Sequence, residues 1–120
     1  MVAGINEELK NSILSVILRH VSAEASLVFL FGSFAAGTAH PHSDIDIGFF
    51  GEEALPRTTL REIREDLDET VRTLRSIDFV DFSSVHDPVF VKAALEGGIT
   101  WYQGKGCGTS LESLKTRLAG

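Results

Sequence analysis

The chain has 120 residues, a formal net charge of −6 and 43% hydrophobic residues. This length predicts a single domain over residues 1–120, and the apolar fraction argues against a disordered chain. The negative charge disfavours direct binding of nucleic acid or of an anionic membrane surface. Because Cys107 is the single cysteine, and because neither a secretory signal nor an apolar run of roughly 20 residues is found, we expect a cytoplasmic protein without a membrane anchor.

The first half of the chain is expected to alternate helix and strand. Its hydrophobic pattern predicts a helix, a buried strand, a loop and a second strand at residues 5–21, 25–31, 39–43 and 44–50. Successive side chains of a strand point to opposite faces. Asp44 and Asp46 should therefore lie on one face of the second strand, and Ile45 and Ile47 on the other.

The second half continues this alternation. It predicts a helix, a strand, a short helix and an edge strand at residues 59–75, 77–82, 89–95 and 99–102, followed by a last helix that begins near Thr109. Two pairs have the spacing of a capping box at a helix start: Thr59 with Glu62, and Thr109 with Glu112. In the predicted strand, Asp78 and Asp81 should point to opposite faces because they are three residues apart.

One constellation carries chemistry: Gly32-Ser33 at a strand end, then ten residues, then Asp44-Ile45-Asp46. A glycine at a strand-to-helix turn lets backbone N–H groups approach an anion, and the serine adds a hydroxyl donor. Carboxylates at i and i+2 of a strand lie roughly 6 to 7 Å apart, and they repel each other unless a cation lies between them. The pattern therefore suggests a nucleoside triphosphate held by Mg²⁺ ions, with a third carboxylate from a neighbouring strand.

This spacing resembles the signature of the polymerase β-like nucleotidyltransferase superfamily, and the short chain resembles its minimal nucleotidyltransferase branch. The resemblance covers nearly the whole order of predicted elements. It implies an α/β (α+β) fold in which helices pack on a small mixed β-sheet. It also implies Mg²⁺ and ATP as cofactors, and transfer of AMP from ATP to a hydroxyl group with release of pyrophosphate.

The resemblance implies roles for six residues: nucleotide binding by Gly32, Ser33 and Ser43, and metal binding with catalysis by Asp44, Asp46 and Asp78. Asp81 is the alternative third carboxylate. Many members of the minimal branch are encoded beside a HEPN-family toxin ribonuclease and are reported to add AMP to a tyrosine of that toxin. The resemblance therefore implies a HEPN-family toxin as acceptor and partner, in a hetero-oligomer, with a second copy of this chain as the other candidate partner.

One departure from the family pattern concerns the phosphate site. Members often have Gly-Ser-Arg-Ala-Arg-Gly, whereas this chain has Phe34 and Ala36 in place of the two arginines. The phosphate charge must then be met by magnesium, by backbone donors, by a partner, or by basic groups elsewhere, such as His40, His42 or Lys105.

Two alternative functions follow from the same residues. In the first, the chain neutralises a HEPN partner by contact alone, because the basic residues after Ser33 are missing. In the second, it adenylylates a small molecule such as an aminoglycoside, which is disfavoured because such enzymes usually carry an additional domain. A zinc site at His40 and His42 is also disfavoured, because no further ligand is in register.

Overall fold

The computed structural model describes residues 4–85 and 87–119, with the side chains of residues 117–119 excepted. Four strands form one mixed sheet in the order β3-β2-β1-β4. Their bounds are Leu27–Phe31 for β1, Ile45–Phe50 for β2, Ile77–Asp81 for β3 and Ile99–Gln103 for β4. The central strand β1 is antiparallel to β2 and β4, whereas β2 and β3 are parallel. The expected mixed sheet with helices is therefore confirmed.

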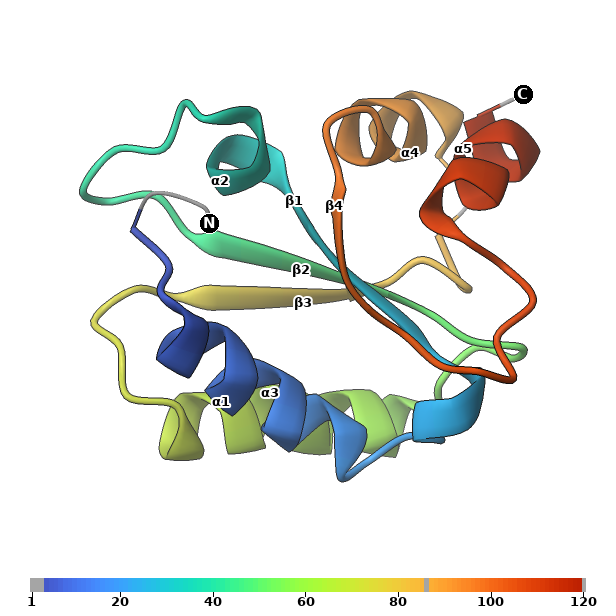
Figure 1. Ribbon diagram of the computed structural model, residues 1–120. Helices are drawn as coiled ribbons and strands as arrows, with labels where there is room; N and C mark the ends of the chain where they lie inside the picture. Colours follow the sequence, from blue (N-terminus) through green and yellow to red (C-terminus); the bar gives the residue numbers. More distant parts are fainter. Residues whose placement is uncertain (1–3, 86, 120) are drawn as a thin grey trace.

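Helices cover both faces of this sheet (Figure 1). On one face lie α1 (Glu7–Leu18) and α3 (Arg57–Thr70), and on the other lie α4 (Pro88–Leu95) and α5 (Leu111–Ala119). The short α2 (Gly32–Ala36) follows β1 directly, and a 3-10 turn, η1 (Ala23–Ala25), precedes β1. Within the described part of the chain, none of the helices has both the length and the apolar character needed to cross a membrane.

The alternation of side chains along the strands divides the core in two. Between the sheet and α1 with α3, the buried strand residues are Val28, Leu30, Ile45, Ile47, Phe49 and Phe79. Between the sheet and α4 with α5, they are Leu27, Phe29 and Phe31, packed with Phe82. All five residues of β1 are buried, as expected for a central strand covered on both faces. The side chains of β2 that alternate with Ile45 and Ile47 therefore face α4 and α5.

The third helix differs most from its prediction. It spans Arg57–Thr70 and not 59–75. Pro56 precedes its first turn and no described side chain caps it, so the capping box of Thr59 and Glu62 is wrong. The helix ends because Val71 adopts an extended backbone (ψ 124°), which starts the turn leading to β3. Leu74, which lies within the predicted range 59–75, is fully exposed as a result.

The remaining elements agree with their predictions apart from their ends. The side chain of Asn6 accepts a hydrogen bond from the Leu9 amide (2.8 Å), so α1 begins at Glu7 and is shorter than residues 5–21. At the start of α5, Ser110 Oγ accepts from the Ser113 amide (3.2 Å), so Ser110 takes the capping position predicted for Thr109. These shifts follow from local hydrogen bonds that periodicity alone does not distinguish.

Candidate active site

Parallel pairing of β2 with β3 brings two of the predicted carboxylates side by side. Asp46 and Asp78 are direct partners in the register of the two strands. Asp46 is also opposite Phe31, the last residue of β1. The predicted glycine-serine turn therefore begins next to Asp46, and Asp44 comes two residues earlier on the same side of the chain. The structure thus places Gly32, Asp44, Asp46 and Asp78 at one end of the sheet.

Gly32 allows the carboxylate of Asp46 to lie against the start of α2. Its φ of +74° is a left-handed conformation that residues with a side chain rarely adopt. A Cβ atom at this position would overlap with Oδ2 of Asp46. Both the backbone angle and the close approach therefore require glycine here. Ser33 follows within the same turn and is partly exposed.

The surroundings of Asp46 favour the protonated form of its carboxyl group. Burial, the negative charges of Asp78 and Asp44, and a hydrogen bond with Asp78 together raise the pKa of Asp46 from 3.8 to about 6. The largest cause is burial, followed by the charge of Asp78. A bound cation would favour the ionised carboxylates, whereas without one a proton is retained more readily.

The donor set suits Mg²⁺. Among the described residues, no three His, Cys, Asp or Glu side chains are grouped closely enough to form a complete metal cage. Magnesium does not need one, because it commonly binds through one or two carboxylates together with water and substrate phosphates. Asp46 and Asp78 provide two adjacent carboxylates, and the side chain of Asp44 is exposed and can turn toward them.

Asp81 is not at this end of the sheet. It pairs in register with Phe49 at the far end of β3 and is 4% exposed. Its Oδ2 accepts a hydrogen bond from the Leu55 amide (2.8 Å), and its Oδ1 accepts one from the Ser83 amide (2.9 Å). The position beside Asp46 therefore belongs to Asp78, and Asp81 stabilises the loops that follow the strands.

Ser43 and the suggested basic groups have different surroundings. Ser43 is buried, and its Oγ accepts a hydrogen bond from the His40 amide (2.8 Å), so it shapes the turn before Asp44. His40 and His42 are exposed on that turn. Lys105 does not lie near the carboxylates: the adjacent Gly104 bonds to Ser26, just before β1 begins, at the opposite end of the sheet. Lys105 as the phosphate cation is therefore wrong.

The arginine at this end of the sheet was missed by sequence reasoning. Arg75 lies in the turn before β3, and its guanidinium carbon is 4.8 Å from the centroid of the Phe34 ring. Its Nη1 donates to the carbonyl oxygens of His40, Pro41 and Ser43, each at 3.1 Å. An arginine three residues before Asp78 was the available signal, but only the fold brings its turn beside residues 40–43.

A pocket of about 390 Å³ opens in front of the paired carboxylates. Asp46 and Asp78 line it from the sheet, Phe90 of α4 lines it from one side, and Arg64 of α3 from the other. The ring of Phe90 is 40% exposed and makes an edge contact with Phe31, with centroids 6.3 Å apart. A substrate hydroxyl can therefore approach the carboxylates along an apolar wall.

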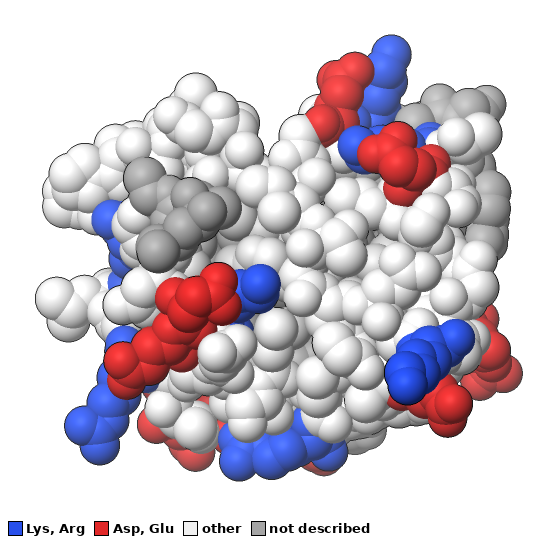
Figure 2. Space-filling view, in the orientation of Figure 1, with Lys and Arg blue, Asp and Glu red and all other residues white. Residues whose placement is uncertain are grey.

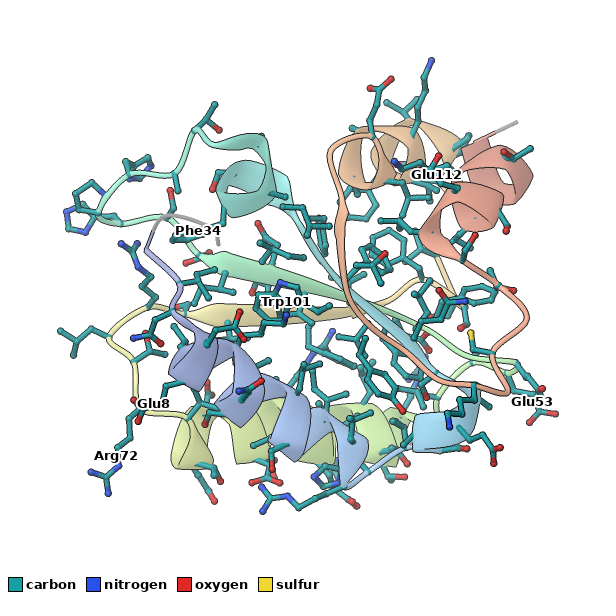
Figure 3. All side chains as sticks on the ribbon, viewed as in Figure 1. Glu8, Phe34, Glu53, Arg72, Trp101 and Glu112 are labelled. Atoms are coloured by element: carbon teal, nitrogen blue, oxygen red, sulfur yellow. The ribbon has the colours of Figure 1, made fainter. Side chains whose placement is uncertain are left out.

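The other edge of the sheet, formed by β4, lies in a largely uncharged part of the surface. Figure 2 shows the charged side chains mainly at the rim of the face it presents, with a largely uncharged centre. Trp101 of β4 lies in the middle of this view (Figure 3) and is half-buried. The hydroxyl of its neighbour Tyr102 donates to the Ala23 carbonyl (2.7 Å). Both residues therefore belong to the packing of β4 against the core.

Comparison with known proteins identifies relatives over most of the chain. The family model described as polymerase beta, nucleotidyltransferase matches residues 11–105. The protein adenylyltransferase MntA of Shewanella oneidensis is 26% identical over 95 residues, which are 79% of this chain and 67% of that protein.

Solved structures share the fold. A toxin–antitoxin complex with AMP-PNP superposes with a TM-score of 0.73 at 23% identity, covering 91% of this chain and 82% of that chain. A complex of the tri-AMPylated Shewanella oneidensis HEPN toxin with the MNT antitoxin superposes with a TM-score of 0.65 at 20% identity, covering 84% and 75%. At these identities the similarity shows a common fold, and the chemistry has to be argued from the site itself.

Proposed function

Since the chain belongs to the polymerase beta nucleotidyltransferase family, we propose that it transfers AMP from ATP to a hydroxyl group of a protein in a Mg²⁺-dependent reaction. The acceptor we propose is a cognate HEPN-family toxin, so that the chain acts as the antitoxin. The similarity to a protein adenylyltransferase, and to antitoxins solved with HEPN toxins, supports this choice of acceptor.

The observation that carries the proposal is the pairing of Asp46 with Asp78 beside Gly32. Two like charges at partner positions of a sheet repel each other unless a counter-ion is bound. Burial, together with the charge of Asp78, raises the pKa of Asp46 to about 6. Such a pair next to a glycine turn, in front of a pocket, suits a site that binds a divalent cation and phosphate oxygens.

The proposed reaction is an in-line displacement at the α-phosphorus of ATP. The hydroxyl oxygen of the acceptor attacks that phosphorus and forms a new P–O bond, while the bond to the oxygen bridging to the β-phosphorus breaks. Pyrophosphate leaves with the bonding electron pair, and the hydroxyl proton passes to the exposed carboxylate of Asp78. When bound, Mg²⁺ supplies neutralisation of the phosphate charge and lowers the pKa of the attacking hydroxyl.

Each residue of the site has a separate task in this reaction. Asp44, Asp46 and Asp78 would hold the cations, and Asp78 also receives the proton of the acceptor hydroxyl. The backbone amides of Gly32 and Ser33, with the Ser33 hydroxyl, orient the triphosphate. The pocket beside Phe90, which is lined largely by residues of β3, admits the acceptor.

A second candidate function, neutralisation of the toxin by contact alone, is favoured by a separate observation. Phe34 is buried in the core at 3% exposure, and Ala36 carries no charge, so α2 contributes no cationic side chain to a triphosphate. In that case the fold would be retained for binding and the carboxylates would be dispensable. The two functions differ in whether toxin inhibition requires Asp46.

The decisive experiment incubates the chain with the neighbouring gene's product, Mg²⁺ and ATP labelled at the α-phosphate. We expect label on the toxin with the wild type and loss of label with Asp46→Asn, which keeps the shape of the side chain. Glu53→Gln is a matched control because Glu53 is exposed at the far end of the molecule from Phe34 (Figure 3).

The outcomes separate the two candidates. Labelling that persists in Asp46→Asn would contradict the catalytic assignment. If no label is transferred but the wild type and Asp46→Asn both inhibit the toxin, neutralisation by contact is correct. Inhibition that is lost together with label in Asp46→Asn, and retained in Glu53→Gln, would support transfer of AMP as the mechanism.

A further inference from the structure

Two turns meet where β2 and β3 begin, and one side chain joins them. Residues 40–43 form the turn that leads to Asp44, and residues 73–76 form the turn that leads to Asp78. Arg75, half-buried between them, donates from Nη1 to three carbonyl oxygens of the first turn, each at 3.1 Å. The last of these, the Ser43 carbonyl, is in the peptide bond that joins Ser43 to Asp44.

Two further hydrogen bonds fix the backbone on either side of Asp44. The Ser43 amide donates to the His40 carbonyl (2.9 Å), and the Ile45 amide donates to the Ser76 carbonyl (2.9 Å). Asp44 therefore lies between two anchored amides, while its own side chain is exposed. Because an exposed carboxylate has little packing to orient it, its direction depends on the backbone that Arg75 holds.

The guanidinium of Arg75 is bound by neutral groups only, as far as the described residues show. Its contacts are with neutral groups, namely the three carbonyl oxygens and the face of the Phe34 ring. None of the described carboxylates lies within ion-pair distance of it. A cation that is held by carbonyls and an aromatic face retains its field, which favours an anionic ligand nearby.

We propose that Arg75 is a positioning residue for nucleotide binding: it holds the 40–43 turn so that Asp44 is directed toward the cation and triphosphate, and it contributes a positive charge at the end of the sheet where α2 has none. This inference rests on the proposed function. Arg75 would thus supply a basic group to a chain that has Phe34 and Ala36 in α2.

The test compares Arg75→Met, Arg75→Lys and Arg72→Met. Methionine keeps the apolar stem over Phe34 but cannot donate to the carbonyls, whereas lysine restores a charged donor. Arg72 is the matched control, because its side chain is exposed and extends away from the molecule (Figure 3). Two quantities are measured: calorimetric affinity for AMP-PNP with Mg²⁺, and hydrogen exchange of the Ser43 and Ile45 amides.

We expect Arg75→Met to weaken nucleotide affinity about tenfold or more, the range found when residues that orient metal ligands are removed. Exchange of the two amides should accelerate, Arg75→Lys should recover part of the affinity, and Arg72→Met should match the wild type. Wild-type affinity in Arg75→Met would overturn the inference, even if exchange accelerates, because the arginine would then be only structural. A wild-type chain that binds no nucleotide and transfers no AMP would instead refute the proposed function.

Discussion

The aspartates at the two ends of the parallel β2–β3 pair have different hydrogen-bond partners. At one end, Asp46 is half-buried against Gly32 with Asp78 as its direct partner, and its pKa is raised to about 6. At the other end, Asp81 is 4% exposed, but two backbone amides donate to it at 2.8 and 2.9 Å. Donors, and not depth of burial, distinguish a structural carboxylate from one that is available for a ligand.

The largest expected effect is on catalysis at the first end. Asp78→Asn should lower the rate of AMP transfer about 100-fold or more, because the variant loses a metal ligand and the proton acceptor. Since Asp78 is exposed, the substitution should change the free energy of unfolding of the protein by less than about 0.5 kcal/mol. Single-turnover labelling and urea unfolding measure the two quantities. Retention of more than about a tenth of the rate would remove Asp78 from the site.

A substitution at the other end should have the reverse pattern. Asp81→Ala leaves the partly buried amides of Leu55 and Ser83 without their acceptor, which should cost about 2 kcal/mol of stability. Asp81→Asn retains one acceptor oxygen and should cost less. Urea unfolding compares the variants, and nucleotide binding by the folded protein should be unchanged. If both variants are as stable as the wild type, the contrast between the two ends is incorrect.

The smallest expected effect is the pH dependence that Asp46 contributes without metal. The unfolded chain releases this proton near pH 3.8 and the folded chain near pH 6, so between these values the folded state binds more protons and stability falls as pH rises. After allowance for solvent screening we expect a loss of about 1 kcal/mol. Urea unfolding in EDTA from pH 3.5 to about 7 should show this loss in the wild type and not in Asp46→Asn. A parallel pH profile in the two proteins would show that folding does not raise the pKa of Asp46.

Much of the fold was predictable because its signals are local. The continuous apolar run before Gly32 predicts a central strand, and the alternation from Asp44 to Ile47 predicts which side chains share a face. The end of α3 was not predictable, because Leu74 continues the apolar spacing while the chain turns at Val71. That turn is stabilised by contacts of Arg75 with residues more than 30 positions away in sequence.

The family, the mixed fold and the spacing of the glycine-serine turn from two aspartates could be inferred from the amino-acid sequence, because they depend on residue types at fixed intervals along one chain. The residue of β3 that joins them could not, since it depends on strand register, which places Asp78 beside Asp46 and buries Asp81 under backbone donors. The same holds for the basic group. The amino-acid sequence does not distinguish Lys105 from Arg75 as the cation near the carboxylates. The sheet places Arg75 at the end where both aspartate-bearing strands begin, and Lys105 at the other end.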